Sequence, residues 1–253
     1  MRIKNIYAAV RWQLTKALRF FLHFDERFWK PKKTIDLNQL FSQRASQPGF
    51  FFIQVGANDG LTGDSLREYI IRYKWQGVLV EPVPYVFARL VENYQAVEGL
   101  NFENSAIGSS DGLLNFYSLA EFDLQGNKLF SDTEKYKIDQ LGSFDKETLL
   151  KHAYMHQDFE KLIREIKVPT IPFSQLCAKY QVQKIGLLQL DVEGYDYEIL
   201  KDINFATLQP SIVIFEHQHM KKLHYKAIVK KLSVSGYDFF VDNWDTVAIL
   251  QTK

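Results

Sequence analysis

Cysteine is almost absent from this chain: Cys177 is the only one among 253 residues. A single thiol excludes an intramolecular disulfide framework and any zinc site built from several cysteines. Long apolar runs are missing too. No stretch approaches the roughly 18 consecutive apolar residues of a membrane-spanning helix, so we expect none. The composition, 46% apolar and 24% charged, is that of a protein with a packed core, and the length suits one α/β domain.

Basic charge is concentrated at the N-terminus. Residues 1–33 carry nine Lys or Arg and two acidic residues, whereas residues 34–253 carry 22 basic and 28 acidic residues. An acidic body offers no cluster of cations to a phosphate backbone, because such contacts need Lys and Arg gathered on one face. We therefore expect no nucleic-acid partner.

The basic arm, residues 1–33, precedes a single domain that we place at residues 34–253. Within the arm, residues 3–24 repeat apolar side chains at three- and four-residue spacing, which predicts an amphipathic helix. One interpretation is peripheral contact of residues 1–30 with an anionic membrane surface. The alternative is a helix that packs on its own domain or on a second subunit of a homo-oligomer. We expect a cytoplasmic protein in both cases.

The body alternates short apolar runs with amphipathic segments. The runs predict strands, and the segments between them predict helices, which together indicate a doubly wound, mostly parallel sheet of Rossmann type. The sequence also predicts a C-terminal antiparallel hairpin. A doubly wound sheet that ends in such a hairpin is the usual layout of S-adenosylmethionine (SAM) methyltransferases. The predicted strands are 50–55, 77–80, 100–103, 184–191 and 211–216, the helices are 64–73, 84–94, 195–201 and 221–234, and the hairpin is 237–250.

Two further segments complete the prediction. Asp111-Gly112 lies between apolar runs and predicts a hairpin over residues 107–119. Residues 120–168 are rich in charge and are expected to form a largely helical insertion that acts as a lid or binds the acceptor. Candidate residues within this insertion are Gly142, Ser143, Phe144, His152 and His156.

The loop after the first strand is the first candidate binding element. It reads Gly56-Ala57-Asn58-Asp59-Gly60, and Glu81 ends the second strand about 20 residues later, a spacing at which a carboxylate accepts from ribose hydroxyls. The dinucleotide pattern G-x-G-x-x-G is not met, because Asn58 stands at its second glycine. Asp59 and Asp64 would repel a pyrophosphate but suit an ammonium and a sulfonium. The loop therefore favours SAM over NAD.

Acidic and imidazole side chains follow two later strands. Asp191 and Glu193 come directly after residues 185–190, and Glu216 and His217 end the next predicted strand. We expect these four to form one catalytic constellation at the carboxyl edge of the sheet. His217 is the first choice for the base that takes a proton from a hydroxyl acceptor, and Asp191 is the second. Alternatively, Asp191, Glu216 and His217 hold a divalent cation.

Taken together, these motifs resemble the FkbM-type family of SAM-dependent methyltransferases. The resemblance runs from Phe50 to the C-terminus, and its marks are FIQVGANDG at 52–60, VEPVP at 80–84, NSAIG at 104–108 and LQLDVEG at 188–194. It implies a Rossmann-like fold, SAM as the methyl donor, and transfer commonly to a hydroxyl oxygen. The association of the family with surface-glycan and natural-product pathways favours a sugar, a glycan or a related small hydroxyl-bearing metabolite as acceptor.

The resemblance also implies roles for particular residues. The methionine part of SAM is expected near Gly56, Asn58 and Gly60, and the ribose near Glu81. The adenine is expected near Ser105 and Ala106, and the reacting end near Asp191 and Glu193. Gln54 and Ser65 are further candidate donor contacts. Gln54 stands where the family often has Asp, and Gln189 stands where it often has Lys, so both positions lack a charge. Two alternatives stay open: an NAD-dependent oxidoreductase, and a catalytically inactive methyltransferase-like scaffold.

Overall fold

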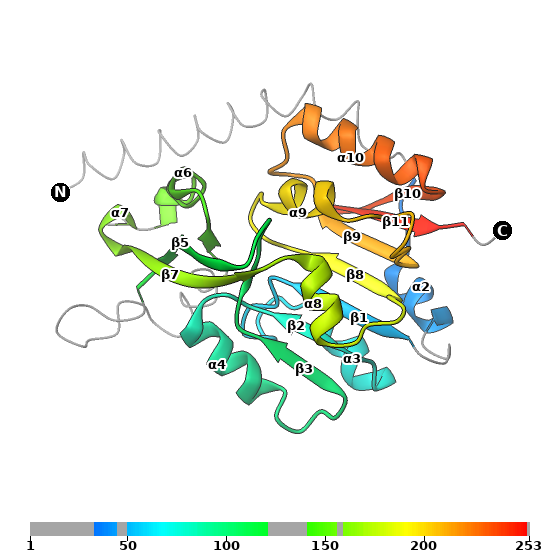
Figure 1. Cartoon of the computed structure of the whole chain (residues 1–253), viewed down its shortest axis with the longest axis horizontal. Helices are drawn as coiled ribbons and strands as arrows, with labels where there is room; N and C mark the ends of the chain where they lie inside the picture. Colours follow the sequence, from blue (N-terminus) through cyan, green and yellow to red (C-terminus); the bar gives the residue numbers. More distant parts are fainter. Residues whose placement is uncertain (1–32, 45–49, 121–140, 156–158, 252–253) are drawn as a thin grey trace, which may run out of the picture.

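The computed structural model describes residues 33–44, 50–120, 141–155 and 159–251 (Figure 1). The helix expected at residues 3–24, the first part of the insertion and His156 lie outside this range. No helix within the described ranges has both the length and the apolar character needed to cross a membrane.

The described residues contain a seven-stranded main sheet with the order β10-β11-β9-β8-β1-β2-β3. Its strands are β1 (Phe51–Val55), β2 (Gln76–Val80), β3 (Leu100–Glu103), β8 (Leu187–Leu190), β9 (Ile212–Glu216), β10 (Tyr237–Asp242) and β11 (Asp245–Leu250). The pairs β1–β2, β1–β8, β2–β3 and β8–β9 are parallel, and β11 runs antiparallel to both β9 and β10. This arrangement confirms the predicted mostly parallel sheet with its C-terminal antiparallel hairpin.

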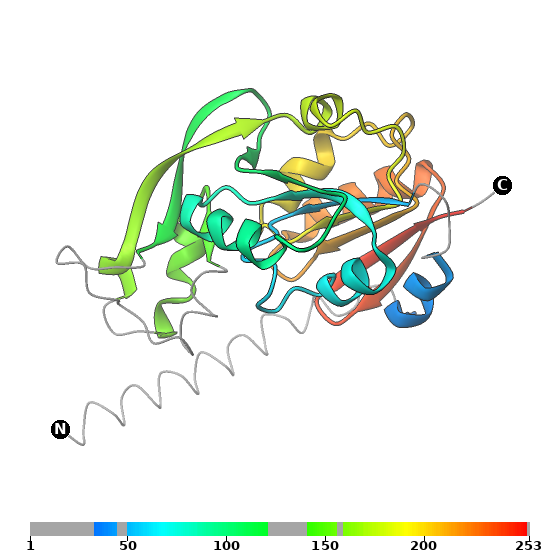
Figure 2. The same ribbon diagram turned by 90° about the horizontal axis from the view of Figure 1, so that it is seen from below.

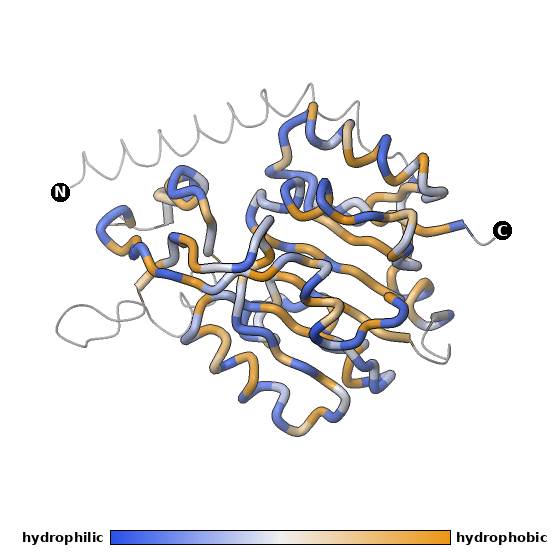
Figure 3. Tube along the Cα trace, in the orientation of Figure 1, coloured by the Kyte–Doolittle hydropathy of each residue, from blue (hydrophilic) through white to orange (hydrophobic). Residues whose placement is uncertain are grey.

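Helices cover both faces of this sheet, which makes it doubly wound (Figure 1). One face packs against α8 (Phe173–Lys179), α9 (Asp196–Asp202) and α10 (Lys222–Val234), and the other against α2 (Leu37–Arg44), α3 (Arg67–Tyr73) and α4 (Pro84–Asn93). Within β1, Ile53 and Phe52 are fully buried on opposite faces. The central strands are therefore mostly apolar (Figure 3), because they have no face exposed to water.

A second, four-stranded sheet has the order β4-β7-β5-β6 and extends beyond the main sheet to one side (Figures 1 and 2). Its strands are β4 (Ala106–Ile107), β5 (Gly112–Leu119), β6 (Gly142–Ser143) and β7 (Ile163–Ile171). The predicted hairpin over residues 107–119 is wrong, since β4 and β5 each pair with β7 instead of with one another. Buried Phe116 and Val168 pack against Val83 and Val86 and attach this sheet to α4.

The expectation of a largely helical insertion is wrong for β6 and for the first part of β7. The insertion does contain α6 (Lys146–Leu150), the 3-10 turn η2 (Ala153–Met155) and α7 (Phe159–Leu162). In β7, Glu165 and Lys167 are exposed whereas Val168 and Thr170 are buried. This alternation is that of a half-buried strand, and Glu165 and Lys167 lie on its solvent side.

Candidate active site

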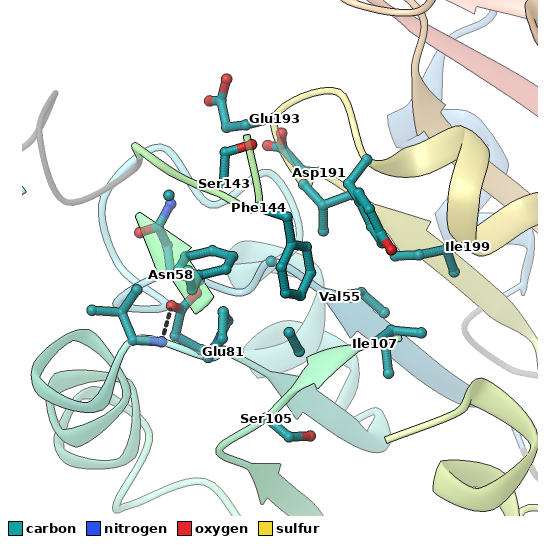
Figure 4. A pocket seen from close by; sticks show the side chains of 18 residues that line it. Val55, Asn58, Glu81, Ser105, Ile107, Ser143, Phe144, Asp191, Glu193 and Ile199 are labelled. Carbon is teal, nitrogen blue, oxygen red and sulfur yellow. Dashed lines mark hydrogen bonds between the residues drawn. The ribbon is translucent and has the colours of Figure 1, made fainter. Parts of the chain in front are cut away.

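A pocket opens where β1, β2 and β8 end, against a wall formed by the second sheet (Figure 4). It encloses about 570 Å³ including its open mouth. The predicted site residues that line it are Gly56, Asn58, Glu81, Ser105, Ala106, Asp191 and Glu193. The carboxyl edge of the sheet thus brings together residues that are up to 137 positions apart in the sequence.

Gly56 allows the loop after β1 to approach the end of β8. Its φ is +81°, and a Cβ placed there would lie 1.9 Å from the carbonyl oxygen of Asp191. The backbone N–H of Asp191 donates to the carbonyl of Val55 at 3.0 Å. A side chain at position 56 would force these two segments apart, so the glycine is what holds Asp191 beside the first loop.

Glu81 is fixed at the base of the pocket. Its side chain is only 6% exposed. Oε2 accepts from the backbone N–H of Asn58 at 3.2 Å, and Oε1 accepts from that of Val83 at 2.9 Å. These two contacts fix the orientation of the carboxylate before any ligand binds. A carboxylate oxygen can accept more than one hydrogen bond, so these contacts are compatible with a further bond from a ligand hydroxyl.

The side of the pocket next to Glu81 is apolar. Pro82, Val83 and Ala106 line it, and Ser105 is buried beside them. Opposite, the ring of Phe144 packs against Phe116 and Tyr195, with ring centroids 5.1 and 4.7 Å apart. Phe144 was a sequence candidate, but Phe116 and Tyr195 were missed because no local pattern marks them as wall residues. They reach the pocket through the strand pairing of the second sheet and the loop that precedes α9.

Carboxylates crowd the other end of the pocket. Asp191 is surrounded by protein atoms but exposes its side chain to the pocket. Burial, followed by repulsion from Asp64, raises the pKa of Asp191. Burial, followed by repulsion from Asp191, raises the pKa of Glu193 to about 7 and that of Glu216 to about 9. Such a cluster favours a ligand that brings positive charge, because added cation relieves the repulsion among the acids.

His217 does not lie in the pocket. Its ring is buried, its Nδ1 lies 3.1 Å from Oγ1 of Thr246, and its centroid is 5.9 Å from that of Tyr225. This position argues against His217 as the general base. Among the described residues, the set Asp191, Glu216 and His217 also does not converge closely enough to hold a cation. Glu216 lies behind the lining carboxylates, within the cluster but not on the pocket wall.

Gln54 and Gln189 are register partners on the parallel strands β1 and β8, so the two departures from the family pattern lie side by side. Nε2 of Gln54 donates to Oδ1 of Asp64, and Nε2 of Gln189 donates to Oγ of Ser65, each at 3.0 Å. Gln54 and Ser65 therefore take part in a polar network behind the pocket instead of lining it. Gly60 is also absent from the lining, because it packs against Tyr94 and Leu90.

A family model described as the methyltransferase FkbM domain matches residues 54–239. The chain belongs to the FkbM methyltransferase family. Over 183 residues, this FkbM methyltransferase is 24% identical to the 2-O-methyltransferase NoeI of Sinorhizobium fredii, a match that covers 70% of this chain and 67% of NoeI. The relationship to the family confirms the resemblance drawn from the four sequence motifs.

Solved structures similar to this FkbM methyltransferase include a precorrin-6y C5,15-methyltransferase from Geobacter metallireducens GS-15 (10% identity, 89% of this chain and 93% of that chain, TM-score 0.40). Another is the ribosomal protein L11 methylase from Lactobacillus delbrueckii subsp. bulgaricus (10% identity, 85% and 77%, TM-score 0.40). TM-scores this low carry no information about the substrate of the FkbM methyltransferase. The substrate is therefore inferred from the geometry of its own pocket.

The pocket of this FkbM methyltransferase fits the SAM that its family implies. The buried carboxylate of Glu81 is held ready to accept from two neighbouring hydroxyls, as a ribose presents them. Pro82, Val83 and Ala106 offer an apolar surface to a purine ring. The acidic end at Asp191 suits the positive sulfonium. A pyrophosphate would meet carboxylates at both ends of this pocket, which makes NAD a poor fit.

Asp196 offers a stability test next to the site. It is 1% exposed, its Oδ1 accepts from the backbone N–H of Glu216 at 3.2 Å, and burial, followed by repulsion from Asp191, raises its pKa from 3.8 to about 8. A carboxyl whose pKa is higher in the folded state destabilises the fold increasingly as the pH rises from the lower value to the higher one. At pH 8, Asp196→Asn is therefore expected to raise the free energy of unfolding by about 1–3 kcal/mol.

Chemical denaturation of both proteins at pH 8 and near pH 4 measures this gain, which should shrink toward zero at the lower pH. Asp202→Asn, an exposed change at the other end of α9, is the control and should leave stability nearly unchanged. A loss of stability in Asp196→Asn at pH 8 would contradict the burial argument.

Proposed function

We propose that this protein transfers the methyl group of SAM to a hydroxyl oxygen of a sugar, a glycan or a related small metabolite. The proposal rests on one observation: the same pocket has Glu81 fixed at its base and Asp191 exposed at its acidic end. NoeI, the relative named as a 2-O-methyltransferase, supports oxygen as the receiving atom. Such a reaction needs alignment of two substrates and removal of one proton.

Glu81 and the apolar side of the pocket hold the donor in this proposal. Bound SAM supplies a methyl group on positive sulfur, which an oxygen attacks in line with the departing sulfur. Glu81 accepts from the ribose hydroxyls, and its orientation costs nothing on binding because Asn58 and Val83 already fix it. Phe144 and Tyr195 face this side and exclude water from the reacting end.

Asp191 acts on the acceptor. It is exposed to the pocket, and its raised pKa makes it a stronger base than an ordinary aspartate. In this position its carboxylate orients the acceptor hydroxyl and takes the proton that the hydroxyl loses as the C–O bond to the methyl carbon forms. Asp191 therefore replaces His217, which faces Thr246, as the expected base.

The test has a binding arm and a transfer arm. Calorimetric titration should show SAM and S-adenosylhomocysteine binding well above NAD. Incubation with isotopically methyl-labelled SAM and a panel of sugars, oligosaccharides and amines should place the label on a hydroxyl oxygen, which fragmentation mass spectrometry and NMR of the product distinguish from nitrogen. Tighter binding of NAD, or label found on amines only, would overturn the proposal. Binding of SAM with no transfer to any member of the panel would favour the inactive scaffold.

A further inference from the structure

Two histidines and a glutamate converge at the rim of the pocket. His152 follows α6 in the insertion, Glu193 lies between β8 and α9, and His219 lies between β9 and α10. One ligand atom of each lies within 4.8 Å of the others. Three separate segments of chain bring these side chains together, and none of the three belongs to the part of the pocket next to Glu81.

The local geometry holds the three side chains in place. Nε2 of His152 lies 3.9 Å from Oε2 of Glu193, and the rings of His152 and His219 have centroids 6.2 Å apart. The side chains of His152, Glu193 and His219 are 14%, 20% and 20% exposed, so they are largely withdrawn from bulk water. Gly194, next to Glu193, has a φ of +90°, and a Cβ placed on it would come within 3.5 Å of the His219 Cβ, so the two loops run close together here.

Two other features of this cluster are unusual for surface residues. Glu193 has a φ of +49°, a left-handed conformation that costs a non-glycine residue free energy and is enriched at functional sites. Glu216 lies behind the cluster, with Oε1 3.5 Å from Nε2 of His219, and its Oε2 is buried with no hydrogen-bond partner among the described residues. A carboxylate behind a ligating histidine is the usual means of orienting its imidazole.

From this convergence we infer that His152, Glu193 and His219 form a binding site for one divalent transition-metal ion. Two imidazoles and one carboxylate are a ligand set that suits Zn²⁺, Mn²⁺ or Co²⁺ and leaves further coordination positions open. Mg²⁺ prefers oxygen ligands alone and should bind less well. The ligand atoms would have to approach to about 3.3 Å of one another around an ion with bonds of about 2.0 Å, a modest rotation of side chains from their present positions.

The charge of the surroundings supports the inference. The carboxyl groups of Asp191 and Glu216 lie close enough to that of Glu193 to repel it, and Lys151 is a nearby described cation that attracts it. An ion with two positive charges would relieve the repulsion far more than one lysine does.

The site would act on the acceptor side of the pocket. Figure 4 shows Glu193 at the rim, with its carboxylate turned away from Glu81. An ion held there would offer its open positions to oxygen atoms of the acceptor and lower the pKa of a bound hydroxyl, leaving Asp191 to take the proton. This role rests on the proposed function, whereas the metal site itself does not.

Metal binding can be measured without donor or acceptor. The full-length, untagged protein is stripped with a chelator and titrated calorimetrically with Zn²⁺ and Mg²⁺, and Co²⁺ binding is followed by visible absorption. We expect one ion per chain and at least tenfold tighter binding of Zn²⁺ than of Mg²⁺. His152→Ala, Glu193→Gln and His219→Ala should each weaken Zn²⁺ binding at least tenfold. The matched control is His224→Ala, because His224 stacks on Tyr197 at 3.8 Å between centroids and is not part of the cluster.

Thermal melts of the metal-free variants show whether each still folds. If a variant does not fold, pulsed electron paramagnetic resonance of the wild-type protein loaded with Cu²⁺ answers the same question, because it detects nitrogen from coordinated imidazoles directly. Three results would each overturn the site. The wild type could bind no ion, the cluster variants could bind Zn²⁺ as tightly as His224→Ala does, or the Cu²⁺ spectrum could lack imidazole nitrogen. None of these measurements uses SAM. The metal site can therefore be refuted while methyl transfer is confirmed, and methyl transfer can be refuted while the metal site is confirmed.

Discussion

Glu81→Ala is expected to weaken SAM binding by about 100-fold. The carboxylate sits 6% exposed at the end of β2, where two backbone N–H groups fix it, and it is the described group best placed for the ribose hydroxyls. Two hydrogen bonds to a charged acceptor contribute about 1.5–3 kcal/mol each, so losing both costs at least 100-fold in affinity. Calorimetric titration of SAM and S-adenosylhomocysteine measures the effect.

Stability has to be separated from binding in this experiment. Removing Glu81 also leaves the N–H groups of Asn58 and Val83 without their acceptor, which is expected to lower the free energy of unfolding by about 1–3 kcal/mol. Glu81→Gln keeps an acceptor oxygen and the shape of the side chain, and it should fold while still binding SAM weakly. Glu92→Ala, an exposed change on α4, is the control. SAM affinity unchanged in a folded Glu81→Gln would show that the ribose lies elsewhere.

Asp191→Ala is expected to lower turnover by about 100- to 1,000-fold while SAM affinity changes only a few-fold. The side chain is exposed to the acidic end of the pocket, away from Glu81, and positioned proton transfer of this kind contributes about 100- to 10,000-fold to a rate. Single-turnover assays with saturating SAM and acceptor isolate this effect from binding. The control is Asp238→Ala, an exposed change on β10.

The partition between affinity and rate is the decisive feature of the Asp191 result. A residue that orients the hydroxyl and takes its proton should reduce kcat and kcat/KM together. A large loss of SAM affinity with an unchanged rate at saturation would instead assign Asp191 to donor binding. Normal turnover would remove it from the chemistry and leave Glu193 as the other lining carboxylate at the acidic end of the pocket.

The main sheet could be predicted from the sequence because its strands are buried on both faces. Residues 51–55 and 187–190 are apolar except for one glutamine each, and such runs indicate strands without any knowledge of their partners. Glu81 and Asp191 followed from the same argument, since ligands gather at the carboxyl ends of parallel strands. Local patterns were thus sufficient to predict that Glu81 and Asp191 line one pocket.

The second sheet could not be predicted in this way. β7 pairs with β4 and β5, and its register joins Thr170 to both Ala106 and Gly112, across about 60 residues. Nothing local records such a pairing, and the charged residues on the solvent side of β7 resemble those of a surface helix. His217 was misplaced for a related reason: a sequence gives the end of a strand but not which face each side chain takes, and His217 faces Thr246.

The contact between Gly56 and the carbonyl of Asp191 ties the donor loop to the residue proposed to act on the acceptor. With no space for a single methyl group between them, the two cannot shift independently, and evolution has little freedom to reshape either one alone. Diversification toward new acceptors would then fall to the opposite wall, where Phe116 and Phe144 come from a separate sheet. Exchanging that wall between relatives is accordingly the most economical route to an enzyme with an altered choice of acceptor.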